Sequence, residues 1–216
     1  MSRPADPNAK IALLRAAEAA FAAHGLDGAK VDEIARSAGV SKGAFYLHFA
    51  SKEEAFLHVM ERFLAACARS FDPSDIPADA LTTPASTLEF WLTRDLETFE
   101  FLWANRATLA MLPSCSGPYG YLLASYRTQA HAAVVRWVDE AKRCGVFRSD
   151  VDGPVASMLL FGAYNELAFQ LASRAKKPPL RSWLLEAQNT FTRAFGVPTL
   201  IAALPHVSRS TKARKG

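Results

Sequence analysis

The chain has 216 residues and a mass of 23.6 kDa; half of its residues are apolar and 11% are aromatic. These values suffice for one compact domain, or for a small module joined to a larger one, and they exclude a wholly disordered chain. The formal charge is +4 and the pI about 9.0, but four basic residues, Arg209, Lys212, Arg214 and Lys215, lie in an acid-free C-terminal stretch. Without them 21 basic residues balance 21 acidic ones, so any claim of nucleic-acid binding rests on where the charges lie.

Cysteine usage and the N-terminus are typical of a cytoplasmic protein. Cys67, Cys115 and Cys144 form no CxxC pair, which predicts small buried thiols in a reducing compartment rather than disulfides or a zinc site. The N-terminus leads into an amphipathic stretch and not into the apolar core of a signal peptide. The longest uncharged run, residues 107–126, contains two prolines and two glycines and is a poor membrane span.

The first two helices are predicted from capping and periodicity. Asp6-Pro7 is the pattern of an N-cap followed by proline at the first helical position, and Gly25 ends the helix. A second, short helix over residues 31–38 carries apolar side chains at positions i, i+3, i+4 and i+7. Gly39 stops it.

The third helix, over residues 41–47, is predicted to be held at a fixed angle to the second. Ser41 is its expected N-cap, and Val40 and Phe45 have the spacing of a hydrophobic staple across that cap. Phe45 and Phe49 are expected to anchor its inner face in the core.

Five more helices are predicted further along the chain. Ser51-Lys52-Glu53-Glu54 is typical of a capping box and opens a fourth helix that runs to about Phe71. After a loop over residues 72–80, further helices are expected from Pro84 through Trp103 and over residues 119–143, 153–173 and 181–195. No window shows the period-2 alternation of a strand, so the predicted fold class is all-α.

Two short helices joined by a tight glycine-containing turn, with another helix before them, make the helix-turn-helix pattern. The outer side of the helix over residues 41–47 presents Lys42, Gly43, Ala44 and Tyr46, with His48 just beyond. No acid falls between Val40 and Lys52, and an acid-free face suits a polyanion because each neutralised phosphate releases counterions. Small side chains let such a helix lie deep in a major groove about 12 Å wide.

Other chemistries compete for the same residues. Gly39-Val40-Ser41-Lys42-Gly43 matches a G-x-S-x-G nucleophile elbow, but that motif needs a strand before the serine and the preceding pattern is helical. No histidine has the Glu three residues earlier that a ferritin-like di-metal site needs, and no phosphate loop occurs. We therefore predict no catalytic residues, no metal and no cofactor.

The segment GVSKGAFYLHFASKEE, residues 39–54, preceded by Val31-Asp32-Glu33-Ile34-Ala35, resembles the N-terminal domain of the TetR family of transcriptional regulators. The resemblance covers residues 8–60 closely, whereas the remainder agrees only in length and helical character. It implies a homodimeric repressor in which each subunit joins a three-helix DNA-binding head to a helical ligand-binding body.

The resemblance also implies which residues contact DNA. Lys42, Gly43 and Ala44 would approach bases and backbone, whereas Tyr46, His48 and Lys52 would bind phosphates. This chain departs from the family at two positions, Lys30 and Ala44, where the family often has Thr. A lysine is a weak N-cap but can reach a phosphate, so at Lys30 a charge contact with DNA would replace a cap. At Ala44 one polar contact with DNA would be missing. The predicted DNA-contact set is Lys30, Ser41, Lys42, Gly43, Ala44, Tyr46, His48 and Lys52.

The predicted body has more large aromatic side chains than one helix seam requires. Each one taken alone is more often simple core packing, but together they favour an apolar cavity for a small apolar or aromatic ligand. The candidate lining is Trp91, Phe99, Trp103, Met111, Tyr126, Trp137, Phe161 and Tyr164, with Arg94, Arg106 and Asn165 as polar anchors.

Glu166 is the only charged residue from Gly153 to Ser173, so this helix must be covered on several sides. With the helix over residues 181–195 it is the predicted dimer interface, a four-helix bundle, in agreement with the resemblance. Two heads on a two-fold axis would then read half-sites of a palindromic double-stranded operator about 34 Å apart.

The predicted organisation is a helix-turn-helix domain over residues 1–52, a ligand-binding and dimerisation domain over 53–200 and a basic, disordered tail over 201–216. A ligand is expected to act by population shift, through different affinities for two states of the body. Two alternatives remain from the residues alone: a small-molecule-binding helical protein whose head has lost DNA binding, and a helical enzyme.

Overall fold

The computed structural model describes residues 7–69, 76–77 and 79–204, and their regular structure is helical. The α-helices are α1 (Pro7–Gly28), α2 (Val31–Ser37), α3 (Lys42–His48), α4 (Lys52–Arg69), α5 (Pro84–Ala104), α6 (Arg106–Leu109), α7 (Gly120–Arg143), α8 (Gly153–Ala172), α9 (Leu180–Phe195) and α10 (Pro198–Ala202). Two 3-10 turns, η2 (Leu112–Ser114) and η3 (Gly117–Tyr119), precede α7. The predicted all-α class is therefore confirmed.

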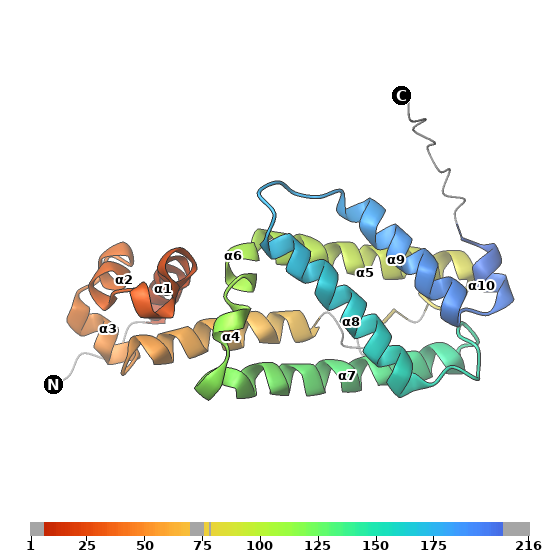
Figure 1. Ribbon diagram of the computed structural model, residues 1–216, viewed down its shortest axis with the longest axis horizontal. Coiled ribbons are helices and arrows are strands. Elements are labelled where there is room, and N and C mark those ends of the chain that lie inside the picture. The colour runs from red at the N-terminus through yellow and green to blue at the C-terminus, as the bar shows by residue number, and fades with distance from the viewer. Residues whose placement is uncertain (1–6, 70–75, 78, 205–216) are drawn as a thin grey trace, which may run out of the picture.

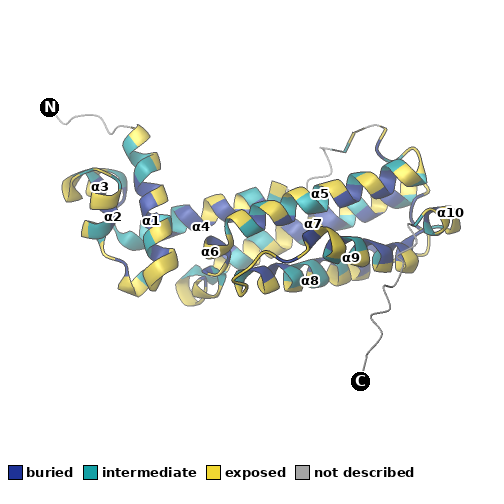
Figure 2. Cartoon of the chain, turned by 90° about the horizontal axis from the view of Figure 1, so that it is seen from above, coloured by how far each residue is buried: buried dark blue, intermediate teal, exposed yellow. Residues whose placement is uncertain are grey.

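The molecule is elongated, with α1, α2 and α3 gathered at one end as a head (Figure 1). Helix α4 runs from the head into the body, where α7 packs against α8 and α5 against α9. Figure 2 shows buried positions along the inner sides of these long helices and exposed positions on their outer sides. The short helix α6 touches both α1 and α8 and so joins the head to the body.

Side-chain caps set three of the predicted helix starts. The Ser41 hydroxyl accepts a hydrogen bond from the Ala44 N–H at 3.1 Å, and the Asp152 carboxylate accepts one from the Val155 N–H at 2.9 Å. Thr83 and Ser86 form a reciprocal capping box at the start of α5. Each cap satisfies a backbone donor that the first turn leaves unpaired.

The capping box predicted at Ser51 differs in one bond. The Ser51 hydroxyl accepts from the Glu54 N–H at 3.1 Å as expected, but the Glu54 carboxylate accepts from the N–H of Ala50 and not from that of Ser51. Ala50 lies between α3 and α4, so its amide has no place in either helix. These two hydrogen bonds therefore cap the start of α4 and also attach the loop before it to the helix.

The structure differs from the predicted helices at the end of α1 and after α9. Helix α1 has a left-handed residue at Gly25, with φ +69°, and then continues for one more turn to Gly28. Helix α10 was not predicted, because Pro198 was interpreted as a stop signal although it stands in the first turn of this helix. Helix α10 extends into the first two residues of the predicted disordered tail, 201–216. Residues 205–216 of that tail lie outside the described residues, and so does the predicted end of α4 at Phe71.

The core is continuous from the head into the first part of the body. Phe45 and Phe49 are fully buried, as predicted. Phe56 of α4 is also fully buried, and Phe21 packs edge-on against it with ring centroids 5.5 Å apart. Tyr119 from the body contacts the same Phe56 ring at 5.6 Å. Cys67 and Cys115 are buried as expected, whereas Cys144 is exposed because it follows the end of α7 at the surface.

Gly196 occupies a place where two distant segments meet. Phe147 and Gly196 form an isolated antiparallel bridge, with the Arg148 N–H donating to the Phe195 carbonyl at 2.9 Å. A Cβ atom at Gly196 would lie 2.6 Å from the Thr192 carbonyl oxygen. The φ of Gly196, −69°, is open to any residue. Glycine is therefore required by the close approach of the Thr192 carbonyl and not by the backbone conformation.

We expect Gly196→Ala to lower the free energy of unfolding by about 1–3 kcal/mol, because the added methyl group must displace backbone. Gly120→Ala is the matched control: nothing crowds its added Cβ, its φ of −58° is open to any residue, and alanine at the start of α7 should raise stability by about 0.4–1 kcal/mol. Urea unfolding followed by circular dichroism measures both. Equal effects of the two substitutions would contradict the packing argument.

Candidate nucleic-acid interface and body cavity

Helix α3 lies on the surface of the head with one face in the core. Phe45 is fully buried on the inner face, and Phe49, the residue after α3, is buried below it at 5.5 Å between ring centroids. On the outer face Tyr46 is 50% exposed and Leu47 is 61% exposed. Helix α3 is thus a seven-residue helix that is fixed by its N-cap and by two buried rings and that exposes its outer face.

The structure brings the predicted α3 residues to one exposed surface. Ser41, Lys42, Gly43 and Tyr46 are exposed, and Ala44 and His48 are half-buried. Leu47 was missed, although its offset from the Phe45 and Phe49 face already indicated that it points away from the core. The predicted DNA contacts of these residues stay predictions.

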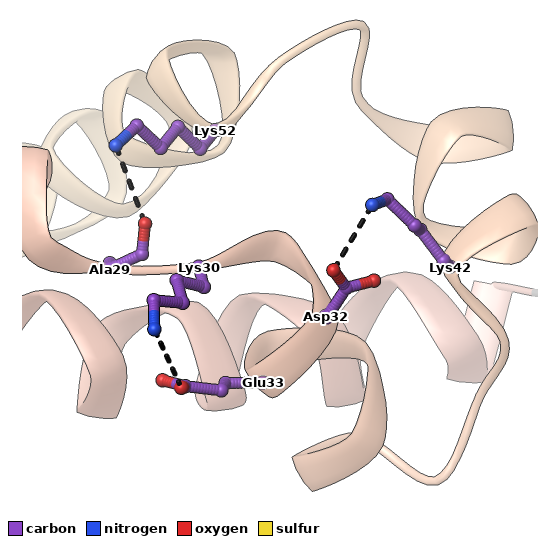
Figure 3. A network of polar contacts seen from close by, with 6 residues as sticks. All are labelled: Ala29, Lys30, Asp32, Glu33, Lys42 and Lys52. Carbon is purple, nitrogen blue, oxygen red and sulfur yellow. Dashed lines mark hydrogen bonds and ion pairs between the residues drawn. The ribbon is translucent and has the colours of Figure 1, made fainter.

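Lys42 is paired across the helix-turn-helix unit. Its ammonium donates to the Asp32 carboxylate at 3.1 Å, from α3 to α2, and this hydrogen bond raises the pKa of Lys42 (Figure 3). Both side chains are more than half exposed, at 55% and 59%, so water and salt screen the pair. The local sequence around α3 lacks acids, but the fold places this one beside it.

Lys52 is fastened to the backbone of the head. Its ammonium donates to the Asp27 carbonyl at 2.8 Å and to the Ala29 carbonyl at 3.3 Å, which Figure 3 shows in part. These bonds tie the turn between α1 and α2 to the start of α4. They use two of the three N–H donors of the ammonium, so the predicted phosphate contact would share Lys52 with this structural role.

Lys30 stands at the N-cap position of α2 and makes no side-chain cap, as expected for a side chain without an acceptor. Its ammonium lies 3.9 Å from the Glu33 carboxylate and the side chain is 74% exposed. Figure 3 shows this pair near the Lys42–Asp32 pair and the hydrogen bond from Lys52 to Ala29.

The body encloses a cavity of about 180 Å³ between α4, α5, α7, α8 and α9. Its wall includes most of the predicted lining: Trp91, Arg94, Phe99, Tyr126, Trp137, Phe161, Tyr164 and Asn165. Phe63, Leu64 and Cys67 of α4 also contribute, which sequence reasoning missed. Their signal was present, since all three lie on the apolar face of α4.

Trp103, Arg106 and Met111 do not line this cavity, so the structure does not bring them together with the other predicted ligand contacts. The Arg106 guanidinium lies over the Trp103 ring, 4.5 Å from its centroid, at the junction of α5 and α6. Met111 is buried in the core that joins the head to the body. Trp103 lies in the last turn of α5, and beyond that helix Leu109 and Leu112, not Arg106 or Met111, reach the cavity wall.

A carboxyl group lies in the cavity wall. Asp95, one turn after Trp91 on α5, accepts a hydrogen bond from the Tyr164 hydroxyl of α8. Burial raises the pKa of Asp95 to about 7, and it also raises the pKa of Tyr164 well above its ordinary value. An acid at i+4 on an apolar helix face was the sequence signal for this pair.

The alternative chemistries find no support in the described residues. Residues 31–37 before Ser41 form α2 and not a strand, and the Ser41 hydroxyl is used as a cap, so the context of a nucleophile elbow is absent. Within the same residues no three His, Cys, Asp or Glu side chains gather as metal ligands. No helix in the described part of the chain combines the length and apolar character that a bilayer span requires.

Comparison with known proteins identifies the head. Residues 13–59 match the family described as "Bacterial regulatory proteins, tetR family". Residues 13–59 form a TetR-family N-terminal domain. The "HTH-type transcriptional repressor SCO4008" of Streptomyces coelicolor is 40% identical over 74 residues, which is 33% of this chain and 38% of that protein. The likeness thus spans well under two thirds of that relative.

Solved structures extend the fold similarity to the body. The structure of SmeT, "the repressor of the Stenotrophomonas maltophilia multidrug efflux pump SmeDEF", has a TM-score of 0.69 at 18% identity and covers 91% of this chain and 95% of that one. A SmeT–triclosan complex has a TM-score of 0.72 at 18% identity, with 89% and 93% covered. The TetR-family head and the helical body together therefore have the fold of these regulators.

The raised pKa of Asp95 predicts a particular pH dependence of stability. The native state holds its proton up to about pH 7, whereas the unfolded chain releases it near pH 4, so the native state binds more protons between these values. The contribution of Asp95 to stability falls by up to about 1.4 kcal/mol for each pH unit in this window. Asp95→Asn should remove this fall.

Urea unfolding of the wild type and of Asp95→Asn at pH values from 4 to 8 tests this expectation. The difference in unfolding free energy between the two proteins should move in favour of the variant as pH rises, and level off above about pH 7. Asp139→Asn, at an exposed position of α7, is the matched control. A difference that is constant across the range would show that Asp95 titrates in the ordinary range.

Proposed function

We propose that the chain is a DNA-binding transcriptional repressor that acts as a homodimer and leaves its operator when a small apolar or aromatic molecule binds the body. The observation that carries the proposal is the exposed, capped helix α3 within a TetR-family head. The name of the Streptomyces coelicolor relative, a transcriptional repressor, supports it. Its likeness covers a third of this chain.

The surface of α3 suits the major groove. Gly43 adds no bulk, Tyr46 offers a hydroxyl, and Leu47 offers an apolar surface of the kind that contacts a thymine methyl group. Lys42 is close enough to Asp32 to be held in place without DNA. A phosphate would compete with Asp32 for this ammonium, and counterion release would favour the phosphate at low salt.

Helix α8 supports the proposed dimer. Four of its large apolar side chains are 47% to 58% exposed in one subunit: Val155, Met158, Leu159 and Phe169. An exposed apolar strip of this kind marks an interface more often than a solvated surface. Helix α9 exposes Arg181, Glu186 and Arg193, so its share of the interface would be polar.

The cavity offers a route from ligand to head. Phe63, Leu64 and Cys67 lie in the last turns of α4, whose first turns pack against α1. A ligand that contacts both α4 and the body favours whichever position of α4 gives the better contacts. It then shifts the population of dimers away from the head spacing that fits the operator. The solved complex of SmeT with triclosan shows that a protein of this fold binds a small molecule.

DNA binding is tested by a mobility-shift assay with duplexes selected from a random pool. Lys42→Ala and Tyr46→Ala should each weaken binding roughly tenfold or more, since each removes a contact from α3, and both variants should stay folded because the side chains are exposed. Lys176→Ala, which removes the same charge from the loop after α8, should bind as the wild type does. Unchanged binding by both α3 variants, or no selected duplex at all, would favour the alternative of a body without DNA function.

The dimer is tested by sedimentation velocity at micromolar concentration. The wild type should sediment as a dimer, and Leu159→Glu should shift it to a monomer, because a buried unpaired charge in an apolar interface is costly. Tyr121→Glu, at an equally exposed apolar residue of α7, should leave the dimer intact. A monomeric wild type would overturn the proposed assembly.

A further inference from the structure

Four buried side-chain atoms in the described residues have no hydrogen-bond partner in the protein: Trp91 Nε1, Thr192 Oγ1 and both amide atoms of Asn189. Trp91 lies on α5, Asn189 and Thr192 lie on α9, and these two helices pack against each other. Trp91 and Thr192 also line the cavity. A buried donor without a partner carries a desolvation penalty that a suitably placed acceptor removes.

The charges in the cavity wall argue against an ionic ligand. Among the described lining residues only Arg94 and Asp95 are charged, and they are neighbours of opposite sign on α5. The Asp95 carboxyl already accepts from the Tyr164 hydroxyl, and the Arg94 guanidinium lies over the Phe90 ring at 5.7 Å. Above about pH 7, where Asp95 is ionised, these two charges offset each other, so the wall offers no surplus charge of either sign to offset the loss of hydration of an ion.

The size and rings of the cavity argue for an aromatic ligand. Trp91 packs against Trp137 and Phe147, with ring centroids 5.0 and 5.5 Å away, and this group forms one wall. A dry cavity of about 150 Å³ holds benzene, so 180 Å³ accommodates one ring with a small substituent. Offset and edge-on contacts with these rings favour a flat ligand.

We propose that the cavity selects a neutral, single-ring aromatic molecule that bears a carbonyl, ether or hydroxyl oxygen. The oxygen accepts a hydrogen bond from the Trp91 Nε1–H, and the Thr192 hydroxyl is the second donor. This inference names the effector class of the proposed regulator and rests on that function. It assigns Trp91 and Thr192 the role of recognising the effector, while the surrounding rings supply the apolar contact.

Four compounds of nearly the same shape separate the possible chemistries. Acetophenone carries an acceptor oxygen, α-methylstyrene replaces it with a CH₂ group, benzamidinium is the cation and benzoate the anion. Isothermal titration of the full chain should give acetophenone about tenfold higher affinity than α-methylstyrene, because a buried donor is satisfied only in the first complex. At pH 8, where Asp95 is ionised, the two ions should bind more weakly than either neutral compound.

Substitutions locate the donors. Trp91→Phe keeps a ring and removes the N–H, so acetophenone should lose about tenfold in affinity, whereas α-methylstyrene should change by less than about threefold. Thr192→Val, of nearly the same volume, should act in the same direction and to a smaller extent. Trp137→Phe is the matched control, since its ring lines the cavity but its N–H is not among the buried unpaired atoms. It should affect both compounds equally.

Three results would overturn the inference: equal affinities of acetophenone and α-methylstyrene, tighter binding of an ion, or no binding of any of the four. If Trp91→Phe lowers the affinity of both neutral compounds equally, the ring and not the donor is responsible, and the assignment is equally wrong. Thermal unfolding of each variant verifies that it folds, and Thr192→Val carries the test if Trp91→Phe does not.

The DNA-binding assay keeps this inference distinct from the proposed function. The mobility shift is measured without any ligand, so a protein that binds a selected duplex but none of the four compounds remains a regulator with another effector class. If the protein binds acetophenone through Trp91 but binds no DNA, the ligand site is supported and the proposed regulatory function is wrong. In a protein that does both, acetophenone should lower the affinity for DNA, and Trp91→Phe should weaken this effect.

Discussion

The apolar face of α4 is the constraint on which the arrangement of this molecule depends. Near its start Phe56 is buried between Phe21 of the head and Tyr119 of the body, so one ring belongs to both cores. Near its end Phe63, Leu64 and Cys67 form part of the cavity wall. Because these side chains lie on one helix, a shift of α4 would move the head and reshape the cavity together. The proposed response to a ligand depends on this link.

The lysine side chains of the head already have contacts within the protein. Lys52 uses its ammonium to fasten the α1–α2 turn to α4, and Lys42 pairs with Asp32 across the helix-turn-helix unit. Such exposed pairs add little to stability. Their effect is to restrict where each ammonium lies before a partner arrives. Lys30, with one ion pair at 3.9 Å and a largely exposed side chain, is the least restricted of the three.

The body contains polar groups that its apolar core does not satisfy. A helix bundle built only for stability would place Val or Leu at Thr192 and Phe at Trp91, because a buried donor without a partner lowers stability. Asp95 is a similar exception, since it is held in the wall by one hydroxyl. Local departures of this kind from the rules of core packing occur at functional sites. They fall here on one cavity.

Local sequence determined much of this protein. Capping residues and apolar periodicity predicted the long helices, and Phe45 and Phe49, four residues apart, determined which face of α3 is buried. The ordered motif of residues 39–54 was enough to predict the family of the head. These features depend on neighbours within one or two turns, where sequence spacing and spatial position are nearly equivalent.

Only the tertiary structure decided which residues from different helices meet. It brought Asp32 to Lys42, joined Asp95 to Tyr164, placed three α4 residues in the cavity wall and left Trp103, Arg106 and Met111 outside it. The spacing of apolar residues identifies the buried face of a helix but not the helix that packs against it. It therefore could not distinguish the aromatic residues around the cavity from those that only fill the core. The partner is selected by how whole helices pack, which depends on side chains far apart in the chain.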